Sequence, residues 1–149
     1  MKLIDEGKIA NFLFDHYSAK AMHQKSTGHA AGGPTSLPTV GTHSQVVAPG
    51  EKTWSQLLAD LTSQQKSFLL VNRYSGQTDP VTGDFSGVAK GSEWWSGGEF
   101  QYCVKETLIA GNVYDCLGSG LSGISAETQV VDSSEESPTI ICDGVSVTA

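Results

Sequence analysis

This sequence of 149 residues lacks long apolar runs and a secretory signal, and it contains few cysteines. The longest apolar run, Phe68 to Val71, holds four residues, far short of a membrane-spanning helix. The opening residues 1–6 lack the apolar core of a secretory signal. Three cysteines are too few, and odd in number, for a disulfide framework. We therefore expect a protein of the reducing cytoplasm with no membrane partner.

Basic side chains are missing from the last third of the chain. Residues 1–105 carry nine acidic and nine basic side chains, whereas residues 106–149 carry seven acidic residues and no Lys or Arg. The net charge of −7 therefore falls on this last segment. Because nucleic acids and anionic membranes are bound by clustered cations, the charge balance argues against both partners. A solvated acidic face is the simplest interpretation.

The remaining composition is that of one globular domain. Hydrophobic residues make up 38% of the chain and Gly adds 17 residues, an ordinary share for a folded protein. The length suits one domain over residues 1–149, and we find no internal repeat and no domain boundary.

The apolar pattern predicts an α+β protein that is predominantly β. A strand, a tight turn at Gly7 and a second strand are expected over residues 3–14, followed by a short helix over 17–23 and a long loop over 27–42. The clearest helix begins after Pro49-Gly50, where Thr53 and Gln56 fit a capping box and apolar residues at 54, 57, 58 and 61 form one stripe.

The second half of the chain favours strands. Residues 67–72 form an apolar run typical of a buried strand, and Gly and Asp divide the chain after residue 78 into short strands. Residues 100–105 alternate as a strand does, and residues 113–117 suggest one helical turn. Residues 139–147 are rich in β-branched side chains and form one strand, or two about Asp143-Gly144. We expect a mixed or antiparallel sheet with one or two short helices.

Candidate catalytic and metal-binding residues follow no strong motif. The histidines at 16, 23, 29 and 43 lack the spacing that places two imidazoles on one helix face, which favours solvent-facing roles. The cysteines at 103, 116 and 142 contain no Cys-x-x-Cys pair. A catalytic cysteine would need a histidine base brought close to it by the fold, and a structural role is favoured for Cys103 and Cys142. Residues 118–123 spell Gly-x-Gly-x-x-Gly, but no strong strand precedes and no sustained helix follows, so a Gly/Ser loop is favoured over dinucleotide binding.

Two further segments have a recognisable chemistry. In residues 79–84, Pro80 fixes φ and Gly83 permits a positive φ, which specifies a turn. Asp79 and Asp84 could meet across this turn, but two carboxylates alone make a poor cation site. Trp94 and Trp95 face opposite sides of a strand, so one ring is available to stack on a sugar or peptide.

At this point the chain resembles a known family. The matching segments are Asn72 to Gly76, Asp79-Pro80-Val81-Thr82-Gly83-Asp84-Phe85-Ser86, Gly98-Glu99, Val104-Lys105-Glu106 and Ile109-Ala110-Gly111-Asn112, preceded by Ser18-Ala19-Lys20 and Ser26-Thr27-Gly28. In order and approximate spacing these resemble the C-terminal half of the TldD/PmbA family, long called modulators of DNA gyrase and understood as cytoplasmic metallopeptidases. The likeness is closer to the PmbA branch, also called TldE. Its signature residues here are Asp79, Pro80, Thr82, Gly83 and Asp84 in the turn, and Ile109, Ala110, Gly111 and Asn112 at a strand end.

The resemblance implies a chain without a complete active site. The family's His-Glu-x-x-x-His motif, which supplies two zinc ligands and the general base, lies N-terminal to this region and is absent here. In TldD-like members a cysteine before the last strand is the third ligand. The nearest candidate is Cys142, which lies past the expected position near residues 135–137. Cys103 also departs from the family, which commonly has Pro there. We expect no catalytic residue and no cofactor in this chain, and zinc only in complete members.

The resemblance also implies a function. The chain is expected to be the C-terminal domain of a TldD/PmbA-like metallopeptidase, forming one wall of a cleft that holds an unfolded peptide beside a sheet edge, within a homodimer or a heterodimer with a TldD-like subunit. Residues 27–41 and 118–123 would line or gate the cleft. One alternative is a stand-alone, non-catalytic assembly module that partners a TldD-like subunit, and another is a carbohydrate-binding module built on Trp94 or Trp95. Met1 falls where the family's catalytic segment ends, so a truncated gene product is a further alternative.

Overall fold

The computed structural model describes residues 1–131 and 134–148, and these form two compact units. The first unit contains residues 1–47 and 130–137, and the second contains residues 48–129 and 138–149. Among the described residues, no helix has both the length and the apolar character needed to cross a membrane.

The first unit consists of short elements. Strands β1 (Ile4–Asp5) and β2 (Lys8–Ile9) pair across a turn in which Glu6 and Gly7 have positive φ. The turn at Gly7 is as the sequence predicts, but the second strand, expected to run on to Phe14, ends at Ile9. Helix α1 (His16–Ala21) begins at Asp15, whose carboxylate accepts from Ser18 N at 2.7 Å. The predicted loop over 27–42 contains a small hairpin of β3 (Ala30–Ala31) and β4 (Thr39–Val40). Strand β5 (Gln45–Val46) pairs in parallel with the start of β11 (Glu135–Cys142).

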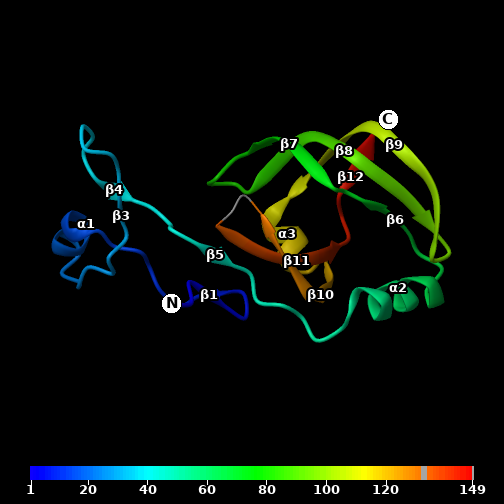
Figure 1. Ribbon diagram of the computed structural model, residues 1–149, viewed down its shortest axis with the longest axis horizontal. Coiled ribbons are helices and arrows are strands. Elements are labelled where there is room, and N and C mark those ends of the chain that lie inside the picture. Colours follow the sequence, from blue (N-terminus) through cyan, green and yellow to red (C-terminus); the bar gives the residue numbers. More distant parts are fainter. Residues whose placement is uncertain (132–133, 149) are drawn as a thin grey trace. The chain divides into compact units, whose positions relative to one another are not determined.

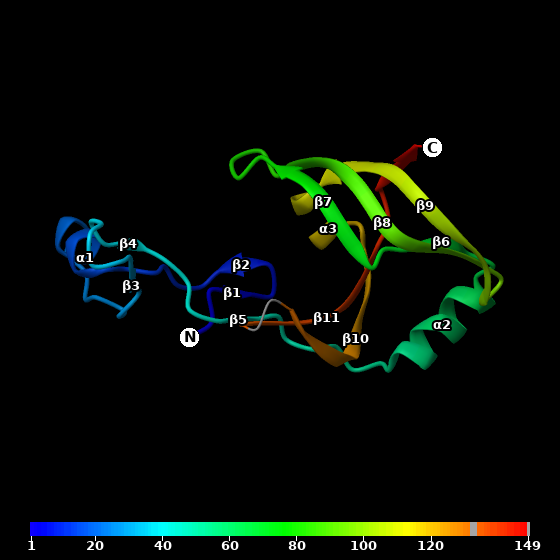
Figure 2. The ribbon, with the colours of Figure 1, turned by 45° about the horizontal axis from the view of Figure 1, so that its top comes forward.

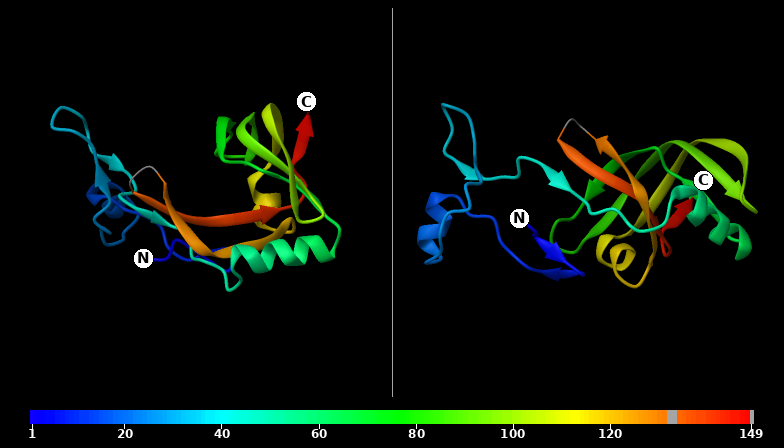
Figure 3. Two further views of the ribbon diagram at one scale, coloured as in Figure 1. Left: turned by 45° about the vertical axis from the view of Figure 1, so that its right-hand side comes forward. Right: turned by 60° about the horizontal axis from the view of Figure 1, so that its bottom comes forward.

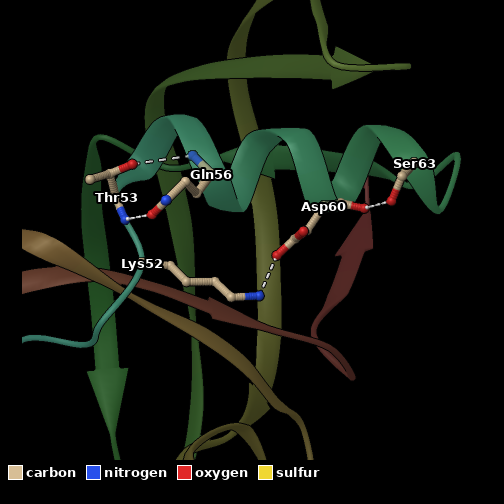
Figure 4. Close-up of polar contacts among 5 residues, drawn as sticks. All are labelled: Lys52, Thr53, Gln56, Asp60 and Ser63. Carbon is tan, nitrogen blue, oxygen red and sulfur yellow. Dashed lines mark hydrogen bonds and ion pairs between the residues drawn. The ribbon is translucent and has the colours of Figure 1, made fainter.

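Helix α2 (Trp54–Ser63) opens the second unit and confirms the predicted capping box (Figure 4). Thr53 Oγ1 accepts from Gln56 N at 3.3 Å, and Gln56 Oε1 accepts from Thr53 N at 2.9 Å. Leu57 and Leu61 of its apolar stripe are buried. Because the cap and the stripe are both local features, the sequence alone was enough to place this helix.

A five-stranded sheet dominates the second unit (Figures 1 and 2). Its central strands β8 (Asp84–Ser96) and β9 (Glu99–Asn112) are long and antiparallel. Strands β6 (Ser67–Leu70) and β7 (Arg73–Thr78) both pair with β8, and β12 (Ser146–Thr148) pairs with the C-terminal part of β9. The expectation of short strands after residue 78 is therefore wrong.

Glycines inside β8 explain this error. Gly87 lies directly opposite Gly76 of β7, and a Cβ at either position would meet the backbone of the other strand. Glycine there permits close approach of two strands rather than ending one of them. Gly97 and Gly98, both with positive φ, do form the turn that joins β8 to β9.

The remaining elements complete an α+β fold that is predominantly β. Helix α3 (Val113–Leu117) follows β9 directly, and a second sheet has the strand order β10-β11-β5, with β10 spanning Leu121–Val131. The strands over 139–147 are two, separated at Asp143-Gly144. The buried apolar residues of the second unit lie in α2, β8, β9 and α3, and they are Leu57, Leu61, Ala89, Ile109 and Cys116.

An aromatic cluster joins α2 to the sheet. Trp54 of α2 meets the edge of Phe68 with ring centroids 6.1 Å apart, and Phe68 stacks on Trp95 at 5.9 Å. Phe100 of β9 then meets Trp95 at 6.1 Å. Figure 3 shows α2 beside the end of the sheet where β8 turns into β9. Trp95 is therefore part of the packing and not a free stacking platform.

Candidate functional site

The predicted signature turn lies between β7 and β8, and hydrogen bonds between a side chain and the backbone of the turn stabilise it. Asp79 Oδ1 accepts from Val81 N at 2.7 Å and from Thr82 N at 3.0 Å. These two amides, Thr82 first, hold the pKa of Asp79 below its usual value. Gly83 supplies the positive φ that the sequence predicts at this position. The carboxylate of Asp79 thus serves the turn rather than a cation.

Asn112 connects this turn to the predicted strand end at residues 109–112. Its Nδ2 donates to Thr82 O and to Asp84 Oδ1, each at 2.8 Å. Its Oδ1 accepts from Tyr114 N at 2.9 Å and from Asp115 N at 3.4 Å, and so caps α3. The two groups of signature residues, far apart in sequence, are therefore one structural cluster.

The open edge of the sheet, defined as residues 99–106 of β9, offers unpaired backbone. Strand β12 covers only Leu108 to Ala110, and no other described strand pairs with the outer side of β9. Since residues of an antiparallel strand direct their N–H and C=O groups alternately to either side, half of these groups face away from β8. Phe100 and Tyr102 are 48% and 57% exposed on this strand. The open edge can therefore accept another extended chain.

A pocket of about 420 Å³ lies between α2 and β10 of the second unit. Leu57, Leu61, Ile124 and Ile141 contribute its apolar lining. Lys52 pairs with Asp60 at 2.6 Å, as Figure 4 shows.

A second ion pair stands beside the same pocket. Lys66 pairs with Asp143 at 3.2 Å, and the Ser122 hydroxyl donates to Asp143 at 2.6 Å. The hydroxyl and then the ammonium group hold the pKa of Asp143 below its usual value. Both lysines at the pocket are therefore already paired with carboxylates.

The three cysteines lie in different surroundings. Cys103 is exposed on β9, Cys116 is buried in α3, and Cys142 is half-buried at the end of β11. Burial and then the neighbouring Cys116 thiol raise the pKa of Cys142 to about 11. A zinc site needs three or more protein ligands, and the described residues contain no such group of His, Cys, Asp or Glu. The described residues therefore do not fit a zinc site, and zinc ligation by Cys142 stays a prediction.

The histidines and the glycine motif lie in unremarkable places. His16, His23 and His43 are exposed, and His29 stacks on His43 with ring centroids 5.8 Å apart. The Gly-x-Gly-x-x-Gly segment forms the turn between α3 and β10 and continues as a strand, which excludes the strand–turn–helix context of a dinucleotide site.

Sequence reasoning missed the open edge and the nearness of the Cys116 thiol to Cys142. The open edge follows from the shortness of β12, which local pattern does not reveal. These two cysteines belong to α3 and β11, which are separated in sequence by the whole of β10. Neither feature leaves a signal in a single sequence.

Comparison with known proteins shows which family contains these signature residues. The family model described as the PmbA/TldA metallopeptidase C-terminal domain matches residues 1–149. "Metalloprotease PmbA" of Escherichia coli is 34% identical over 114 residues, covering 76% of this chain and 22% of that protein. The "Metalloprotease PmbA homolog" of Haemophilus influenzae is 34% identical over 122 residues, covering 81% of this chain and 24% of that protein.

Solved structures show the same fold. TldE from Thermococcus kodakarensis matches with a TM-score of 0.85 and 26% identity, covering 99% of this chain and 33% of that chain. A putative modulator of a DNA gyrase from Thermotoga maritima matches with a TM-score of 0.78 and 21% identity, covering 98% of this chain and 32% of that chain. The chain thus spans a third or less of the proteins it matches.

Proposed function

The chain belongs to the PmbA/TldD metallopeptidase family, matching its C-terminal domain along the whole length, and on this premise we propose that it forms part of a peptide-binding cleft in the cytoplasm. Its substrate in that setting is an unfolded protein or peptide held in an extended conformation. The chain itself contributes binding and assembly, because the His-Glu-x-x-x-His motif of a zinc peptidase is absent from its sequence.

The open edge of β9 is the observation that carries this proposal. Strand addition uses main-chain hydrogen bonds, which every peptide offers regardless of sequence. Phe100 and Tyr102 add exposed aromatic surface along the same strand. A ligand strand laid against residues 99–106 would continue the sheet beyond the short β12.

The first unit supports a second role in assembly. Ala19 is the only fully buried apolar residue among its described residues, whereas Phe12, Tyr17 and Leu37 are 64%, 83% and 89% exposed. Such exposure is typical of surfaces that pack against a partner. We assign this surface to a homodimer or to a heterodimer with a TldD-like subunit. A non-catalytic assembly module that partners such a subunit is the second candidate function, and the same observation favours it.

Peptide binding is tested by fluorescence anisotropy with labelled peptides of about ten residues, long enough to cover the open edge. Two unstructured peptides of unrelated sequence should bind with similar affinity, because the backbone makes the contacts. A matched peptide with two consecutive prolines at its centre loses two donors and should bind about tenfold more weakly. Equal binding of the proline peptide, or no binding of any peptide, would overturn the cleft assignment.

Assembly is tested by analytical ultracentrifugation of the chain alone and mixed with a purified TldD-like subunit. We expect a complex in at least one of these samples, weakened by the double variant Phe12→Ser and Leu37→Ser. The matched control is Val81→Ser, which removes an 82% exposed apolar side chain from the second unit. A chain that stays monomeric in both samples, or a control as harmful as the double variant, would contradict the role of this surface.

A further inference from the structure

The pocket between α2 and β10 is a cavity of the second unit that the proposed function does not use. Its volume of about 420 Å³ falls within the usual range of small-molecule pockets. None of its lining residues belongs to the open edge at residues 99–106. A ligand of this pocket would therefore be bound independently of a strand added to β9.

Backbone hydrogen bonds fix one wall of the pocket. Gly50 N donates to Ser125 O at 2.9 Å, and this begins a short parallel pairing with β10. Lys52 O then accepts from Ala126 N at 2.7 Å. A Cβ at Gly50 would overlap the carbonyl oxygen of Ile124, so glycine permits this close approach of two backbones. The wall is therefore part of the fold and needs no ligand to form.

The interior of the pocket is aliphatic. Leu57 and Leu61 of α2 are buried against it. Ile124 of β10 and Ile141 of β11 line it and remain half-buried. Gly123 leaves space between them, because a Cβ there would lie 3.1 Å from Leu57 Cδ2 and 3.5 Å from Ile141 Cδ1. Since the described lining contains no aromatic ring for stacking, this interior suits a branched aliphatic group rather than a sugar.

The charges around the pocket favour a ligand that carries a positive charge. Lys52 and Lys66 already have anionic partners, Asp60 at 2.6 Å and Asp143 at 3.2 Å. Glu51 is the charged lining residue to which the described part of the chain supplies no ion pair. The second unit as a whole contains ten acidic and five basic side chains, and this excess of negative charge also attracts cations.

We propose that the pocket binds a primary ammonium group joined to a branched aliphatic side chain, the chemistry of a peptide's amino terminus when the first residue is Leu, Ile or Val. The aliphatic side chain would fill the space beside Gly123, where burial of apolar surface supplies affinity. The ammonium group would pair with the Glu51 carboxylate at the rim. An α-amino group has a pKa of about 7.7–8.0 and is therefore largely charged at neutral pH.

Titration of the full chain, labelled with nitrogen-15, with the tripeptide Leu-Gly-Gly-amide tests the site. Amide shifts should change at residues 50–52 and 122–124, which line the pocket. Two control peptides, Gly-Gly-Gly-amide without the side chain and acetyl-Leu-Gly-Gly-amide without the charge, should each bind about tenfold more weakly. Shifts confined to residues 99–106 would overturn the pocket assignment while leaving strand addition at the open edge intact.

Leucinamide distinguishes the two sources of this ligand chemistry. It has the same amine and side chain as Leu-Gly-Gly-amide but no peptide chain. Weaker binding of leucinamide assigns the pocket to amino termini of peptides, and equal binding assigns it to the free amine. Either result at residues 50–52 and 122–124 supports the pocket as an aliphatic amine site.

The variant Glu51→Gln removes the charge from an exposed side chain and keeps its shape, so the fold should melt as in the wild type. Leu-Gly-Gly-amide should bind it about tenfold more weakly, whereas acetyl-Leu-Gly-Gly-amide should bind as before. Gly123→Ala should also weaken binding, because its Cβ takes up space meant for the ligand. The matched control Asp115→Asn removes an exposed carboxylate from α3 of the same unit and should leave the affinity unchanged.

Three results would overturn the proposal. The first is a Leu-Gly-Gly-amide titration that shifts no amide at the pocket. The second is equal binding of the acetylated and the free tripeptide, because the charge would then have no role. The third is a loss of affinity in Asp115→Asn as large as that in Glu51→Gln, because the overall charge of the unit and not the carboxylate at the rim would then attract the ligand.

Discussion

Asn112 joins the signature turn to α3, and replacing it with Ala should destabilise the second unit markedly. The side chain makes four hydrogen bonds, two as the cap of α3 and two as a donor to the turn at residues 82–84. Loss of the cap costs about 1 kcal/mol, and loss of each donor bond costs about 0.5–1.5 kcal/mol. The free energy of unfolding should therefore fall by about 2–4 kcal/mol. In a protein of this size that lowers Tm by about 5–15 °C.

Asn112→Ser separates the two halves of this cost. Serine is a good helix cap but is too short to reach the turn, so this variant should lose only the donor bonds. The assay is urea unfolding followed by tryptophan fluorescence, which reports on the second unit because Trp54, Trp94 and Trp95 all lie there. An Asn112→Ala variant within about 0.5 kcal/mol of the wild type would refute the reasoning, since the turn and α3 would then be held independently of Asn112.

Three further predictions follow from burial and charge. Leu57→Ala should lower the free energy of unfolding by about 2–5 kcal/mol, measured in urea, because Leu57 is 5% exposed and lines the pocket. Since the pKa of Cys142 is raised to about 11, iodoacetamide at pH 8 should modify the exposed Cys103 before Cys142. The rate of modification at Cys142 should rise about tenfold per pH unit from pH 8 to 10. Equal rates of modification at Cys103 and Cys142 at pH 8 would contradict this prediction. The Ser122 hydroxyl is the main group that lowers the pKa of Asp143 in the folded protein. The ionised carboxylate therefore stabilises the fold at pH values above 3.8, its pKa in the unfolded chain, and this stabilisation is lost as the pH falls through the lower pKa of the folded state. Asp143→Asn should therefore be destabilising in thermal melts at pH 7 and neutral at pH 2.

Local features of the sequence predicted the helices well. The Thr53–Gln56 capping box and the leucine stripe of α2 both lie within a few residues, so no distant contact was needed. The same holds for the hairpin around Gly7 and for the separation of β11 from β12 at Asp143-Gly144.

Strand lengths and exposure depended on distant partners. Glycines after residue 78 were expected to separate short strands, but Gly87 permits close approach to Gly76 of β7 within a continuous β8. Phe100 and Tyr102 alternate as core residues do, yet they are 48% and 57% exposed. A register irregularity between Trp94 and Trp95 further interrupts the alternation, and no local pattern announces it.

The candidate site also has parts that local sequence predicted and parts that depend on distant contacts. The residue pattern located the signature turn and the strand end as separate segments, and the structure joins them through Asn112. The nearness of the Cys116 thiol to Cys142 was not predicted, because the two cysteines belong to α3 and β11, which are far apart in sequence. Family resemblance supplied the role that we propose for the domain, while the strand pairing indicated which edge of the sheet is open.

Mapping of backbone amides tests the central claim most directly. The chain labelled with nitrogen-15 is titrated with an unstructured ten-residue peptide, and amide shifts and hydrogen-exchange protection are recorded at both borders of the sheet. We predict changes concentrated at residues 99–106 of β9, with slowed exchange at alternate amides and little change at β7. Changes confined to β7, or an unchanged spectrum at saturating peptide, would contradict the assignment of the open edge as the wall of a peptide-binding cleft.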